Sequence, residues 1–127
     1  DINPGANDTL HAEIAKILNA DENVDGIVIG LDPLSPAMNT LPDSTKKGEA
    51  FSSKSGIVKL MTDLNKTLDK PVLGVVDAGD LYDPMVAALE AGGLPVFRSS
   101  DRAVEALAKY INGRLHASKI QEENVGL

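Results

Sequence analysis

Apolar residues follow two patterns that alternate along this chain, one typical of helices and one typical of strands. Near the beginning, four aliphatic residues recur at positions i, i+4, i+7 and i+8, which share one face of a helix: Leu10, Ile14, Ile17 and Leu18. A continuous apolar run, rich in β-branched residues, follows at 26–31. Such a run is typical of a strand that is buried on both faces. The first 31 residues therefore predict a helix followed by a strand.

The same order returns after a long polar segment at 32–54, which contains three prolines. Loops of this length inside compact domains are usually functional or mobile. Five apolar residues then predict a second helix, for which Ser53 or Ser55 is available as the cap: Ile57, Leu60, Met61, Leu64 and Leu68. The apolar residues of 70–77 predict the second strand.

Two further helices flank a third strand in the last part of the chain. The pair Asp83-Pro84 predicts a helix start, with the Asp83 carboxylate as the cap and proline in the first turn. This helix ends at Gly92-Gly93, and residues 94–97 form the third strand. Ser100-Asp101 then caps a fourth helix, whose inward face is expected to contain Val104, Leu107, Ala108, Ile111 and Leu115.

Strands that alternate with helices require right-handed crossovers, and therefore a parallel sheet. We expect an α/β fold with three layers, α/β/α, around a short parallel sheet of flavodoxin-like type. Residues 1–116 form this domain, and residues 117–127 form a polar tail that is frayed or adds one turn.

Composition narrows the classes of function. The 127 residues suffice for one domain, and with 43% hydrophobic but only 3% aromatic residues its core must be aliphatic. A net charge of −7 without a lysine and arginine cluster argues against a nucleic-acid partner. No apolar run approaches the ~18 residues of a membrane span, so no membrane partner is expected. The chain has no cysteine, which excludes disulfides and thiolate chemistry and fits a cytoplasmic location.

The most informative segment for chemistry is the turn of Gly, Pro and Asn that opens the first helix. Such a turn leaves the first N–H groups of the helix without helical partners, at the positive end of the helix dipole. This arrangement can hold a phosphate, and the candidate phosphate-binding residues are Gly5, Ala6, Asn7, Asp8 and Thr9. The alternative is a helix that is merely capped by Asn7 or Asp8.

Other polar residues give weaker indications. Three carboxylates, those of Asp77, Asp80 and Asp83, follow the second strand and can bind Mg²⁺, although such residues more often cap helices and form turns. Arg98 can pair with an anion or with Asp101. Both histidines, His11 and His116, are expected at the surface. The sequence therefore assigns no catalytic residue and no metal ligand.

Taken in order, several segments resemble the last flavodoxin-like subdomain of the NDP-forming acyl-CoA synthetases, the family of succinyl-CoA synthetase and the acetate–CoA ligases. The most specific part is 93–107, with Gly93-Leu94-Pro95-Val96-Phe97 and then Ser99-Ser100-Asp101-Arg102-Ala103-Val104-Glu105-Ala106-Leu107. The opening residues 1–8, the segment 24–29 and the run Lys70-Pro71-Val72-Leu73 also match. The resemblance covers residues 1 to about 113.

The resemblance implies a ligase mechanism that proceeds through an acyl phosphate and a phosphorylated histidine. In this family, two helices present their N-termini to the phosphohistidine, and the helix opened by Gly5 to Thr9 corresponds to one of them. ATP-grasp and CoA-binding domains or subunits would be the partners. No cofactor is expected in this chain, whereas CoA, a nucleotide and Mg²⁺ are implied for the full enzyme. The isolated chain is not expected to be active alone.

Two alternatives from other classes stay open. One is a non-catalytic binding or regulatory α/β domain, in which the acidic residues at the strand ends hold a metal ion or a partner. The other is an assembly domain whose helices form the interface of a homo-oligomer.

Overall fold

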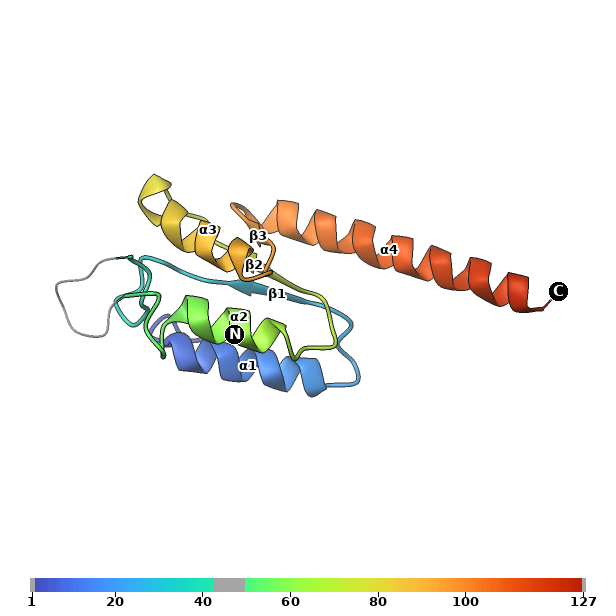
Figure 1. The fold of residues 1–127 in the computed structure, drawn as a ribbon, viewed down its shortest axis with the longest axis horizontal. Coiled ribbons are helices and arrows are strands. Elements are labelled where there is room, and N and C mark those ends of the chain that lie inside the picture. Colours follow the sequence, from blue (N-terminus) through green and yellow to red (C-terminus); the bar gives the residue numbers. More distant parts are fainter. Residues whose placement is uncertain (1, 43–49, 127) are drawn as a thin grey trace.

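A computed structural model describes residues 2–42 and 50–126, so residues 43–49 of the predicted loop lie outside the described residues. The described chain has an α/β fold (Figure 1). Its elements, in order, are α1 (Asp8–Ala20), β1 (Ile27–Gly30), α2 (Ile57–Asn65), β2 (Val72–Val75), the 3₁₀ turn η1 (Asp80–Tyr82), α3 (Asp83–Ala91), β3 (Val96–Phe97) and α4 (Ser100–Val125).

The three strands form one parallel sheet in the order β1-β2-β3, as predicted. Ile27 pairs with Val72, and Gly74 pairs with Val96. All four residues of the central strand β2 are buried. The prediction that the first strand is buried on both faces is wrong, because β1 forms an edge of this sheet: Val28 is half-buried and Gly30 is exposed.

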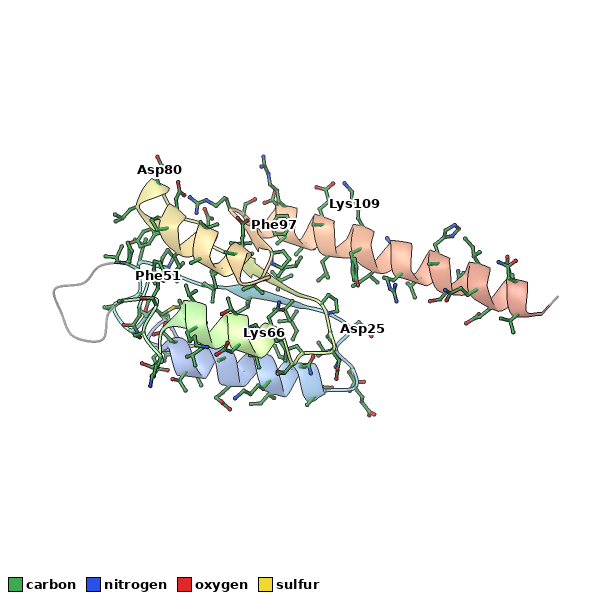
Figure 2. The ribbon with its side chains drawn as sticks, in the orientation of Figure 1. Asp25, Phe51, Lys66, Asp80, Phe97 and Lys109 are labelled. Carbon is green, nitrogen blue, oxygen red and sulfur yellow. The ribbon has the colours of Figure 1, made fainter. Side chains whose placement is uncertain are left out.

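The two faces of the sheet have cores of unequal size. On one face, α1, α2 and α3 pack over strand residues such as Ile27, Ile29 and Val72. On the other face, α4 alone contributes, and its Ala103 packs against Leu73 and Val75. In Figure 2, the labelled Phe97 side chain lies close to the beginning of α4, and it joins this second core as a half-buried residue.

The first helix turns a different face inward from the predicted one. Its buried residues are Asp8, His11, Ala12 and Ala15, which also share one helical face, at i, i+3, i+4 and i+7. The predicted apolar stripe is exposed at Leu10, Ile17 and Leu18, with Ile17 66% exposed. Small side chains let α1 lie close to α2 and β1, and this packing outweighs the larger apolar surface of the stripe.

The second helix begins differently from the prediction, and its inward stripe is confirmed in part, because Leu60 is half-buried and Leu68 lies beyond the end of the helix. Ile57, Met61 and Leu64 are buried. Neither Ser53 nor Ser55 is the cap: the N-cap residue is Gly56, and no side chain caps the helix there.

The third helix begins and ends close to the predicted residues. It starts at Asp83 with proline in its first turn, but the Asp83 carboxylate does not cap it and instead pairs with Arg98. At the other end, the amide of Leu94 donates to the carbonyl of Leu89 (3.1 Å), while Gly93 adopts a φ of 90°. This is a Schellman ending, in which glycine accommodates the left-handed conformation.

The fourth helix is longer and less buried than predicted. Its predicted polar tail is helical through Val125, so the expectation of a frayed end or a single added turn is wrong. Of the expected inward residues, Leu107 and Ile111 are half-buried, whereas Leu115 is 57% exposed. The reason is visible in Figure 1, where α4 extends well past the strands toward the C-terminus.

Candidate functional site

The beginning of α1 lies at the carboxyl edge of the sheet, which is where α/β proteins bind ligands. A cavity of about 360 Å³ lies between the beginning of α1 and the end of β1. Its walls include Ala6 and His11 from the α1 region, and Gly30 and Asp32 from the end of β1. Of the five predicted phosphate-binding residues, Ala6 lines this cavity, which brings the segment close to the carboxyl end of β1.

The turn before α1 uses two of the candidate amides internally. The Gly5 amide donates to the Asn3 side-chain oxygen at 2.8 Å. The Ala6 amide donates to the Asn3 carbonyl, also at 2.8 Å. Gly5 and Ala6 therefore shape the turn, and neither amide is free to meet a ligand while these bonds persist.

Asn7 is the cap of α1, since its side-chain oxygen accepts a hydrogen bond from the Leu10 amide at 2.9 Å. The Asp8 amide contacts its own carboxylate. Among the described residues, the amides of Asn7 and Thr9 have no hydrogen-bond partner. Both residues are exposed. The capping alternative and the anion alternative are thus compatible, because the cap leaves these two N–H groups available.

Asp8 ties α1 to the segment that follows β1. Its carboxylate is buried, with the residue only 3% exposed, and accepts hydrogen bonds from the backbone and side-chain amides of Asn39. Burial raises the pKa of Asp8, although the hydrogen bonds from Asn39 and the nearby His11 oppose this change. A second bond, from the Ser35 hydroxyl to the Pro4 carbonyl (3.1 Å), joins the same two segments.

Replacing Asp8 with asparagine tests whether this carboxylate is buried. The ordinary pKa is 3.8, and a folded pKa above it means that the folded protein binds more protons between the two values. The wild type should therefore gain stability relative to Asp8→Asn as the pH falls from neutral to about 4. Urea unfolding at several pH values measures this difference. A wild type that instead loses stability relative to the variant on acidification would contradict the buried placement.

His11 is not the surface histidine that the sequence predicts. It is 6% exposed, and its Nδ1 lies 2.9 Å from the Asn7 carbonyl. A carbonyl only accepts, so Nδ1 carries the proton in this contact. His116, by contrast, is exposed on α4, as expected. His11 follows Asp8 by three residues, so the two share one face of α1. This spacing is the feature of the sequence that could have indicated a buried His11.

Three of the five candidate residues line a common cleft of about 330 Å³: Asn7, Asp8 and Thr9. The other walls come from Ala37, Asn39 and Ser55. The sequence predicts Ser55 as a helix cap and does not predict Asn39 as part of the site. Among the described residues, the lining contains no lysine or arginine, and the donors that it offers an anion are neutral N–H and hydroxyl groups.

The acidic residues after β2 do not form a metal site. Within residues 2–42 and 50–126, no group of three or more histidine, cysteine, aspartate or glutamate side chains is arranged to hold a metal ion. Arg98 makes an ion pair, but with Asp83 and not with the predicted Asp101. Asp101 instead accepts hydrogen bonds from the Ser99 side chain and the Arg102 amide, which lower its pKa.

No helix in the described part of the chain combines the length and the hydropathy needed to cross a membrane. Comparison with protein-family models, with curated proteins and with solved structures gives no match.

Proposed function

We propose that this chain is a flavodoxin-like subdomain of an NDP-forming acyl-CoA synthetase, acting in the cytoplasm. It packs against ATP-grasp and CoA-binding domains or subunits, and α1 offers its N-terminus to their phosphohistidine. CoA, nucleotide and Mg²⁺ are bound by those companions, so the isolated chain has no turnover. The observation that carries the proposal is the pair of available amides, those of Asn7 and Thr9, on the cleft that Asn39 and Ser55 also line.

The orientation of Asp8 makes the cleft compatible with an anion. A carboxylate beside a phosphoryl group would repel it, but Asp8 is directed to Asn39, whose backbone and side-chain amides both donate to its carboxylate. Neutral donors at a helix N-terminus stabilise a phosphate without a basic side chain. The affinity of this chain for a free anion should therefore be low, and the companion domains would supply most of the binding.

The exposed stripe on α1 supports a companion that covers this side of the domain. Leu10, Ile17 and Leu18 are exposed, and Ile14 is half-buried. Contiguous exposed apolar surface of this kind marks interaction sites in soluble proteins. Leu10 lies in the first turn of the helix, so a domain seated on the stripe would also reach the cleft beside Thr9.

Titration of inorganic phosphate, followed by backbone amide NMR shifts, tests the anion site. The Asn7 and Thr9 amides should shift most, whereas those of Gly5 and Ala6, which are bonded to Asn3, should shift little. The Asp8→Asn variant should bind phosphate several-fold more tightly, since it removes a negative charge from the cleft. Shifts that avoid Asn7 and Thr9 while other amides respond would end the proposal for this site.

A further inference from the structure

The second half of α4 has no cover from the rest of the fold. Every described residue from 112 to 126 is exposed, and Figure 1 shows this part of the helix extending away from the strands. Figure 2 shows side chains that project from both sides of it in this view, and the labelled Lys109 points away from the sheet. Isolated helices of this length are marginal in water. A contact from outside the fold would stabilise it.

An apolar stripe runs along the side of α4 and continues into this uncovered half. It consists of Val104 (56% exposed), Ala108, the half-buried Ile111 and Leu115. The spacings are four, three and four residues, so the stripe has the same pattern in either chain direction. An antiparallel copy of the helix would therefore place Val104 opposite Leu115 and Ala108 opposite Ile111. The small Ala108 would allow the two helices to approach closely.

The charges that flank this stripe favour the same arrangement. Asp101 and Glu105 lie on one flank in the first half of α4, and Lys119 lies on the same flank in the second half. In an antiparallel pair, Asp101 of one helix lies close to Lys119 of the other. Glu105 is already paired with Lys109 of its own helix.

We infer that α4 pairs in antiparallel fashion with α4 of a second copy of this chain, forming a two-fold symmetric dimer. The two-fold axis passes between Lys109 and Tyr110 of each helix. The uncovered half of each helix therefore lies beside the covered half of the other. A second copy fits better than an unrelated helix, because both the apolar spacing and the charges are self-complementary. This surface is separate from the α1 stripe, and the inference does not depend on the proposed ligase function.

Sedimentation equilibrium over a range of concentrations tests the dimer. The wild type should approach twice the monomer mass of 13.4 kDa. Leu115→Glu should raise the dissociation constant at least about tenfold, because it places a charge in the stripe, opposite Val104 of the second copy. The matched control is Ile120→Glu, which makes the same change at a residue that is 46% exposed on nearly the opposite side of the helix. It should leave the dimer intact.

Neither substituted residue belongs to the buried core, so both variants should fold, and circular dichroism verifies this. A wild type that stays monomeric at its highest soluble concentration overturns the inference. Equal loss of the dimer in both variants also overturns it. Retention of the dimer in Leu115→Glu would place the interface elsewhere, which overturns it as well.

Cysteine cross-linking tests the direction of pairing, since the native chain has no cysteine. Antiparallel pairing brings residue 101 of one chain close to residue 118 of the other. Under mild oxidation, a mixture of Asp101→Cys and Ser118→Cys chains should form a heterodimeric disulfide. Each variant alone should cross-link at least about tenfold more slowly. Preferential cross-linking of Ser118→Cys with itself would indicate a parallel pair and contradict the inference.

Discussion

Replacing Gly56 with alanine is expected to lower the free energy of unfolding by at least about 3 kcal/mol. An added Cβ at this position would lie 2.2 Å from the Phe51 carbonyl oxygen and 2.7 Å from the carbonyl carbon. Both contacts are with backbone, so no change of side-chain rotamer relieves them. The 50–56 turn would have to move away from the start of α2, and Ile57, which is fully buried, would move with it.

Gly79→Ala is the matched control for this substitution. An added Cβ there meets nothing within 4 Å, and the backbone conformation suits any residue, with φ at −74°. Its effect should lie within about 0.5 kcal/mol. Chemical denaturation of both variants measures the contrast. Similar stabilities for Gly56→Ala and Gly79→Ala would mean that the turn does not approach α2 as closely as the structure has it.

Gly56 also shows which features of the beginning of a helix can be predicted from the sequence. Ser53 and Ser55 are of a good capping type, and the sequence therefore predicts a side-chain cap at one of them. The actual constraint is a close approach between Gly56 and Phe51, which depends on the path of the whole turn. The stripe inside α2 was predictable, because Ile57, Met61 and Leu64 have no competing apolar face.

The candidate site was predictable only in part, because half of it comes from elsewhere in the chain. The capping turn at Asn7 is local, so its position could be inferred from five consecutive residues. The contact of Asp8 with Asn39 spans 31 residues. No local pattern predicts a pair so far apart. The same limit applies to Arg98, for which the sequence offered the nearby Asp101, whereas the fold provides Asp83.

The sequence predicts the strands better than the inward faces of the outer helices. A central parallel strand is covered on both faces, so its residues are almost all apolar, as in Val72 to Val75. An outer helix can carry one apolar face for its own core and another for a partner. In α1 and α4, the apolar stripes lie mostly outside the core of this chain. Hydrophobic periodicity detects such helices but does not tell which face is turned inward.

A pair of substitutions in α1 separates these two faces directly. Ala15 is fully buried, and Ile17 is 66% exposed, although the sequence favoured the reverse. Ala15→Leu should destabilise the fold by about 3 kcal/mol, since the larger side chain has no space against α2 and β1. Ile17→Ala should change stability by no more than about 0.5 kcal/mol. If the predicted stripe were the core face, Ile17→Ala would instead cost about 2–5 kcal/mol.

Thermal or urea unfolding of the isolated chain gives both values under the same conditions. The ranking also bears on the proposed function, because Ile17 can contact a companion domain only if it contributes little to the core of its own domain. A large loss of stability in Ile17→Ala, with a tolerant Ala15→Leu, would return the stripe to the interior and remove the docking surface. The expected ranking leaves Leu10, Ile17 and Leu18 available beside the cleft at Asn7 and Thr9.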